Sequence, residues 1–211
     1  MRYFGNSLFV AGVSVVISVV MISMSAYVVA RMEFKGKALV NVLLYSTMFI
    51  PATALTYPVY NLVNRLHLYD TRSALILIYS CSGIAVSFFV IKNYYDNIPR
   101  ELEEAAKIDG CNSIKTLWYV IVPMLKPSIV SCALFQFMWS SNDFMGPLLY
   151  VNTPARYPAS IFVKMSMDGD TGFDWNRVLA MSLISIIPSL IVFFLAQDSF
   201  IDGIAAGGVK G

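Results

Sequence analysis

One charged segment, residues 97–127, interrupts an otherwise apolar sequence and holds the acidic side chains most able to do chemistry. Glu101, Glu103 and Glu104 are of a type that binds metal ions or transfers protons as a general acid or base. The single histidine, His67, supplies no partner for such a dyad within a bilayer. The sequence also lacks the HExxH, GxSxG and GxxxxGK[ST] motifs of zinc proteases, hydrolases and nucleotide-binding loops. We therefore do not expect a catalytic site here. Because the three glutamates are expected to be exposed on a helix, they are better explained as a solvated or partner-facing acidic surface.

The spacing within this segment predicts two short helices joined by a sharp bend. Pro99 suits the first turn of a helix, where its missing N–H is not needed, and residues 100–109 are good helix formers. Gly110 suits the left-handed conformation that ends a helix. Asn112 or Ser113 is then placed to cap a second helix. Such a bent pair on a membrane face is best explained as a docking element for a soluble partner.

Two small residues in the first of these helices, Ala105 and Ala106, suggest where a partner approaches. Small side chains allow close contact with another protein's surface, which a larger residue would block. The simpler alternative is that alanine is here only because it favours helices.

The composition is that of an integral membrane protein. Of the 211 residues, 57% are hydrophobic and only 13% are charged, whereas soluble domains carry about 25% charged residues. A net charge of +2 is too small to suggest nucleic acid as a partner. The three cysteines show no paired spacing, so we expect neither a disulfide nor a metal cluster.

Windows without charge predict five transmembrane helices and an all-α fold, a polytopic transmembrane helical bundle with a cytosolic bent-helix loop. We expect a single transmembrane domain over residues 1–211. Its spans are predicted at about 5–30, 38–61, 73–91, 127–150 and 178–198, with the cytosolic loop over 92–126. Prolines within or near these spans should kink or break them, namely Pro51, Pro58, Pro147 and Pro188.

The positive charges predict which loops lie inside. The short segment 31–37 holds three lysines and arginines, which is the clearest cytoplasmic signal. Two crossings later the 92–126 loop is also inside, while residues 61–72 and 152–176 are outside. Met1 then starts outside, directly before a span.

Three polar residues interrupt the predicted fourth span: Gln136, Asn142 and Asp143. A carboxylate within a span is costly and usually faces the interior of a bundle or water. These side chains therefore either line a translocation path or tie helices together by hydrogen bonds, and both interpretations stay open at this point.

The charged segment resembles the EAA loop of ATP-binding-cassette (ABC) importer permeases. The resemblance rests on Glu104-Ala105-Ala106, then Gly110 after three residues, then Val120-Ile121-Val122-Pro123 after nine more. The family usually has isoleucine and leucine where this chain has Val120 and Val122, and both changes keep an apolar side chain. The stretch WSSNDFMGPLLY and the tail IDGIAAGGVKG are similar to the carbohydrate-importing branch, specifically its second permease of the maltose and glycerol-phosphate type. Together these features cover nearly the whole chain.

This resemblance implies the fold of a type I ABC importer permease and roles for particular residues. It implies that Asn142 and Asp143 belong to a motif shared among members with different sugars, which favours architecture over sugar specificity. Contact with a binding protein is expected in the outer segment 152–176, at Arg156, Tyr157, Asp168 and Asp170. Coupling to the ATPase is expected at Glu103, Glu104, Ala105, Ala106, Asp109, Gly110 and Pro123.

The implied function is a membrane-spanning permease subunit of an ATP-driven importer, which translocates a sugar or oligosaccharide delivered by an extracytoplasmic binding protein. The chain itself is expected to be no enzyme and to bind no cofactor, with ATP and Mg on partner subunits. Expected partners are a homologous sister permease, two ATPase subunits, the solute-binding protein, the sugar and membrane lipid, but no nucleic acid. The expected location is the cytoplasmic membrane of a bacterium or archaeon, crossed several times.

Alternative functions are less favoured. The alternative within the family is an ABC permease for a non-sugar solute such as a polyamine, amino acid or ion. An intramembrane enzyme needs a nucleophile–base pair or metal ligands, and a channel or gradient-driven transporter needs no large cytosolic docking loop. The family usually has six spans with both ends inside, so we expect that the first span is missing here, through a fragment or a late start site.

Overall fold

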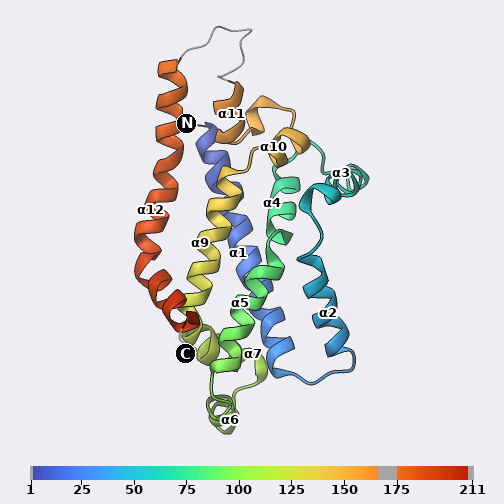
Figure 1. The fold of residues 1–211 in the computed structure, drawn as a ribbon, viewed down its shortest axis with the longest axis vertical. Helices are drawn as coiled ribbons and strands as arrows, with labels where there is room; N and C mark the ends of the chain where they lie inside the picture. Colours follow the sequence, from blue (N-terminus) through green and yellow to red (C-terminus); the bar gives the residue numbers. More distant parts are fainter. Residues whose placement is uncertain (1, 166–174, 209–211) are drawn as a thin grey trace. The chain divides into compact units, whose positions relative to one another are not determined.

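A computed structural model describes residues 2–165 and 175–208 of the chain, drawn in colour in Figure 1. Within these residues every regular element is helical, which confirms the predicted all-α fold. The chain divides into two compact units. The first comprises Met1–Ile17, Pro51–Ser82 and Leu134–Leu195, and the second comprises Ser18–Ile50, Gly83–Ala133 and Ala196–Gly211. The helices α1, α9 and α12 contribute residues to both units.

The first unit is built around the start of α1. Its core joins Val10 to residues of α3, α4 and the end of α10, including Val63, Leu75, Tyr79 and Tyr150. The elements that contribute to it are α1 (Arg2–Arg31), η1 (Ala52–Leu55), α3 (Thr56–Arg65), α4 (Arg72–Cys81), α9 (Lys126–Asn142), α10 (Met145–Tyr150), η3 (Pro154–Arg156), α11 (Ala159–Met165) and α12 (Trp175–Gly208).

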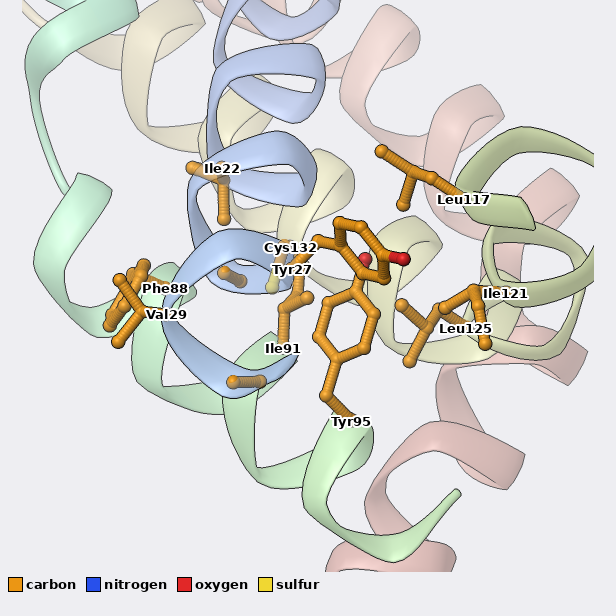
Figure 2. Packing of buried hydrophobic residues seen from close by; sticks show 12 residues of the cluster. Ile22, Tyr27, Val29, Phe88, Ile91, Tyr95, Leu117, Ile121, Leu125 and Cys132 are labelled. Carbon is orange, nitrogen blue, oxygen red and sulfur yellow. The ribbon is translucent and has the colours of Figure 1, made fainter. Parts of the chain in front are cut away.

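The second unit packs the end of α1 against α5 and the charged segment. Figure 2 shows the rings of Tyr27 and Tyr95 beside each other, with Ile121 and Leu125 facing them. The two ring centroids are 5.9 Å apart. Besides parts of α1, α9 and α12, its elements are α2 (Lys37–Thr47), α5 (Ile84–Asn97), α6 (Glu101–Ile108), α7 (Ser113–Thr116), the π-helical turn η2 (Leu117–Ile121) and α8 (Val122–Met124).

Only two helices among the described residues are by themselves long and apolar enough to cross a membrane, Arg2–Arg31 and Val178–Gln197. Three further pairs of helices pass the same criterion if each pair, interrupted by a bend, is counted as one span. The described part of the chain therefore offers two spans, or up to five, and the count of five stays a prediction.

Three of the predicted spans are interrupted, one of them at Pro51, which was predicted to kink or break it, and two at positions without a predicted break. Over 38–61, α2 ends at Thr47 and Pro51 is extended, because proline cannot donate to a helix and disfavours helix in the residue before it. Over 73–91 the break lies at Gly83, which has a φ of 70°. Over 127–150 the helix ends at Asn142 and restarts at Met145. The predicted loop 92–126 also begins within α5, which continues to Asn97.

Hydrogen bonds connect loops that are distant in the sequence into one group within each of the two units. In the first unit, the amide of Asn6 donates to the carbonyls of Ala155 and Tyr157, at 3.0 and 2.9 Å. In the second unit, Arg31 at the end of α1 donates to the carbonyl of Ile98 at 2.6 Å. The start of α1 therefore lies with the loop after α10, and the end of α1 lies with the charged segment.

We expect the second group to be cytoplasmic, and cysteine labelling tests this. Lys35→Cys and Asn152→Cys place thiols at two exposed positions, one in each group. In a background without native cysteines, an impermeant maleimide should label Asn152→Cys in intact cells and label Lys35→Cys only after permeabilisation. The opposite pattern would show that the orientation is reversed.

Candidate coupling site

The charged segment forms the predicted bent pair of helices, α6 and α7, which follow α5 in Figure 1. At the end of α6, Gly110 has a φ of 83° and its N–H donates to the carbonyl of Lys107 at 3.0 Å. The N–H of Cys111 donates to the carbonyl of Ala106 at 2.9 Å. Asn112 then caps α7, because its side-chain oxygen accepts from the N–H of Lys115 at 2.9 Å. The predicted glycine stop and asparagine cap are both confirmed.

Two of the residues predicted to face the ATPase point inward instead. Glu103 is 6% exposed and Ala106 is 5% exposed. The carboxylate of Glu103 lies 2.7 Å from Nε of Arg31, so the residue pairs within its own chain. The interpretation of these two side chains as a solvated or partner-facing surface is therefore wrong. A buried carboxylate needs a charged partner, and Arg31 supplies it.

The other predicted coupling residues remain accessible. They are exposed on α6, on the turn after it, and on α8, namely Glu104, Ala105, Asp109, Gly110 and Pro123. Their contact with an ATPase stays a prediction, and their accessibility is what such a contact requires.

The sequence interpretation missed two apolar side chains beside the bend. Ile108 is 87% exposed at the end of α6, and Ile114 is 65% exposed in α7. Each lies within four residues of Gly110, and exposed large apolar side chains suit contact with a partner protein. The signal was available in the sequence, since both isoleucines flank a helix-ending glycine within a charged segment.

The polar residues of the predicted fourth span form a second cluster, within the first unit. Gln136 donates to the backbone carbonyl of Tyr79 at 2.6 Å. The hydroxyl of Tyr79 donates to Asp143 at 2.9 Å. The same carboxylate accepts from the N–H groups of Met145 at 3.2 Å and Gly146 at 3.0 Å. Asp143 thus accepts from the first two N–H groups of α10 and links it to α4, which supports the helix-packing alternative for Gln136 and Asp143.

Asn142 has a different environment. Its side chain is exposed, its amide donates to the carbonyl of Met138 at 2.7 Å, and it lines a pocket of about 360 Å³. This volume is in the range of small-molecule sites, which are mostly apolar with a few placed polar groups. The same pocket is lined by two phenyl rings and several hydroxyls, among them Phe4, Phe144, Ser7, Ser141, Ser160 and Ser185.

The outer loop after α10 is held in shape by Asp70. Its carboxylate accepts from the N–H groups of Asn152 at 2.9 Å and Thr153 at 2.8 Å, and from the hydroxyl of Thr153 at 2.5 Å. Arg156 lies 2.6 Å from the same carboxylate and also donates to the Asp70 carbonyl. The hydrogen bonds from Thr153, and to a lesser degree the N–H of Asn152 and the positive charge of Arg156, lower the pKa of Asp70 from 3.8 to about 2. These contacts therefore stabilise the fold above about pH 4 and are lost only as the pH falls through about 2.

This loop contains two of the four predicted binding-protein contacts. Arg156 pairs with Asp70, and the hydroxyl of Tyr157 donates to the carbonyl of Asn152 at 2.8 Å. Both side chains thus already have partners within the chain, and their contact with a binding protein stays a prediction. Asp168 and Asp170 lie outside the described residues.

Over residues 2–165 and 175–208, no group of three or more His, Cys, Asp or Glu side chains is placed to hold a metal ion.

Residues 18–198 match the family of binding-protein-dependent transport system inner membrane components. The match covers most of the chain, so the chain belongs to this family. The predicted resemblance to ABC importer permeases is confirmed, and the chain is a membrane permease component of such a transporter.

Individual relatives are similar over almost the whole chain. The inner membrane ABC transporter permease protein YcjP of Escherichia coli is 30% identical over 209 residues, which are 99% of this chain and 74% of the relative. The trehalose/maltose transport system permease protein MalG of Thermococcus litoralis is 32% identical over 99% of this chain and 75% of the relative. The arabinooligosaccharides transport system permease protein AraQ of Halalkalibacterium halodurans is 34% identical over 99% of this chain and 74% of the relative.

A solved structure shows the same fold. It is the crystal structure of a bacterial ABC transporter involved in the import of the acidic polysaccharide alginate. One of its chains matches with a TM-score of 0.83 and 23% identity, over 94% of this chain and 74% of that chain. The fold of an ABC importer permease is thereby confirmed.

Proposed function

We propose that this chain is the membrane-spanning subunit through which an ATP-driven importer moves a sugar or oligosaccharide. The observation that carries the coupling part of the proposal is the bent pair α6–α7 with its exposed isoleucines, Ile108 and Ile114. The sugar part is supported by relatives whose names specify trehalose and maltose, arabinooligosaccharides or sulfoquinovosyl glycerol.

The proposed partner at α6–α7 is an ATPase subunit. The two helices are short and closed by a glycine turn and an asparagine cap, so they form a compact projection rather than a flexible loop. Ile108 and Ile114 supply apolar anchors, while Glu104 and Asp109 supply charges at the rim, an arrangement typical of protein interfaces. ATP and Mg bind on that partner, since the chain has no phosphate-binding loop.

Large apolar side chains elsewhere fit contact with lipid and with a homologous sister permease. Leu39 in α2, Phe49 after it, and Tyr57 in α3 are strongly exposed, as is Leu195 in α12. Such surfaces suit a bilayer or a partner helix. This supports a multi-pass subunit in the cytoplasmic membrane of a bacterium or archaeon, which works with a sister permease, two ATPase subunits and an extracytoplasmic binding protein.

The pocket that Asn142 lines is the proposed place of sugar contact. Its serine hydroxyls and the Asn142 amide suit the hydroxyl groups of a sugar, and the rings of Phe4 and Phe144 suit its apolar faces. Transport then follows alternating access, in which the ATPase state and the permease state share one equilibrium.

A matched pair of glycine variants tests the docking of the ATPase. Gly110 and Gly36 have φ values of 83° and 91°, and an added Cβ would meet no atom within 4 Å at either position. Valine at either site therefore introduces about 1–2 kcal/mol of backbone strain without a steric clash. We expect Gly110→Val to weaken ATPase binding about tenfold and to reduce transport, while the chain still inserts. Gly36→Val, outside α6–α7, should keep both.

The measurement is the amount of ATPase that copurifies with each variant from membranes, together with uptake by cells. If Gly110→Val retains wild-type copurification and uptake, the docking assignment is wrong. Equal losses in both variants would point to general strain rather than docking.

A further inference from the structure

One buried guanidinium joins the ends of three helices in the second unit. Arg31 is the last residue of α1. Its Nη2 donates to the carbonyls of Tyr95 at 2.7 Å and Ile98 at 2.6 Å, where α5 ends. Its Nε lies 2.7 Å from the carboxylate of Glu103 in α6, and both side chains are 8% exposed. Arg31 thus contacts the C-terminal end of α5 and the N-terminal half of α6 at once.

The arrangement requires arginine. A guanidinium is planar and offers donors in a fixed fork, so from a single position it can donate to two carbonyls while its charge faces a carboxylate. The ammonium of lysine is a point charge on a flexible stem and lacks that fork. Because the guanidinium of Arg31 is buried, its contacts with α5 and α6 hold it in a single position. These contacts therefore oppose a displacement of α6 relative to α1 and α5.

A second contact ties α1 to α5 nearby. The hydroxyl of Tyr95 donates to the carbonyl of Ser23 at 3.2 Å, in a buried position. Tyr95 also packs on Tyr27, and both belong to the core of the second unit (Figure 2). The ends of α1 and α5 are therefore joined by three hydrogen bonds and by ring packing, and the Arg31–Glu103 pair adds a contact to α6.

We propose that the Arg31–Glu103 pair is the link that carries the movement of α6 into α1 and α5. The proposal rests on the proposed function, in which an ATPase moves α6. Both are positioning residues, because neither touches ATP or the transported solute. Packing alone can push one element with another, but the attraction between two opposite charges also pulls, and a cycle of opening and closing needs both directions.

The test compares three changes in the complete complex, reconstituted in nanodiscs. Arg31→Met with Glu103→Leu removes both charges, so that neither is left buried without a partner. Arg31→Lys keeps the charge but loses the fork. Lys92→Gln with Asp96→Asn is the control, since this pair, 2.8 Å apart, lies on α5 and is more exposed.

Three quantities are measured on each sample. They are the copurified ATPase, the rate of ATP hydrolysis, and the rate at which an impermeant maleimide labels a cysteine introduced at Ser141, which lines the pocket. The labelling is measured with and without ATP plus vanadate, in a background without native cysteines, so no knowledge of the transported solute is required.

We expect the apolar double variant to bind the ATPase and hydrolyse ATP, while the ATP-dependent change in labelling falls about tenfold, within the range of coupling free energies. Arg31→Lys should give an intermediate loss, and the control should match the wild type. A purely structural role would reduce assembly and leave the response of assembled complexes intact.

The outcomes separate the inference from the proposed function. A wild-type response in the assembled double variant overturns the inference alone. If the wild-type chain itself binds no ATPase, the proposed function is wrong and the inference falls with it. If the double variant does not assemble, Glu103→Gln decides, because it keeps the size of the side chain and removes the ion pair; an unchanged response in this variant overturns the inference.

Discussion

Ile108→Asp is expected to abolish assembly of this permease with its ATPase. The side chain is 87% exposed at the end of α6, so the change has little effect on the fold of the free chain. In the complex it would place a charge where an apolar anchor is buried. Loss of such an anchor costs about 2–4 kcal/mol, which corresponds to a loss of affinity of about 30- to 700-fold.

The matched variant is Ile108→Leu, which keeps an apolar side chain of the same volume and should bind normally. Affinity is measured by titrating the detergent-solubilised chain with the purified ATPase subunit. Wild-type affinity in Ile108→Asp would show that this isoleucine faces lipid or solvent in the complex, and that the interface must be sought elsewhere on the chain.

Gly146→Ala is expected to destabilise the chain itself. A Cβ at this position would lie 2.4 Å from Oδ2 of Asp143 and 3.2 Å from the hydroxyl of Tyr79. The carboxylate would have to rotate away, which breaks its hydrogen bonds from Tyr79 and from the N–H of residue 146. Because hydrogen bonds to a charged group are involved, the loss should be about 2–4 kcal/mol.

The control is Gly12→Ala in α1, where an added Cβ meets nothing within 4 Å. Alanine favours a helix over glycine, so this variant should keep or raise the midpoint of thermal unfolding in detergent, while Gly146→Ala lowers it. In an Asp143→Ala background the clash is gone, and Gly146→Ala should then cost little. A full additive loss in that background would contradict the proposed clash.

The local structure of the charged segment could be read from the sequence. Gly110 and Asn112 in this segment, and Pro51 outside it, act through their own backbone or through groups two to four residues away, and the structure shows each acting as predicted. The family and the all-α fold could also be predicted, because the lengths of the apolar segments and the spacing of Glu104 to Gly110 and Pro123 are visible in the linear sequence.

Helix breaks at positions without a proline could not be predicted from the sequence. Gly83 interrupts a window that is apolar on both sides, and glycine is also tolerated inside helices of membrane proteins. The composition of this window therefore predicts no break, and the positive φ of Gly83 becomes visible only in the folded chain.

The roles of the charged residues were decided by the tertiary structure alone. Glu101, Glu103 and Glu104 are equivalent in the sequence, yet Glu103 alone is buried, because Arg31 lies beside it. In the sequence, Arg31 served only as one of the positive charges that predict a cytoplasmic loop. In the structure, its guanidinium donates to carbonyls that are 64 and 67 residues away in the chain. By itself the sequence determined the class of protein, its apolar segments and the bend at Gly110, all of which depend on local chemistry. Which carboxylate faces a partner and which holds the chain together depends on contacts between distant residues, and only the folded chain brings these together.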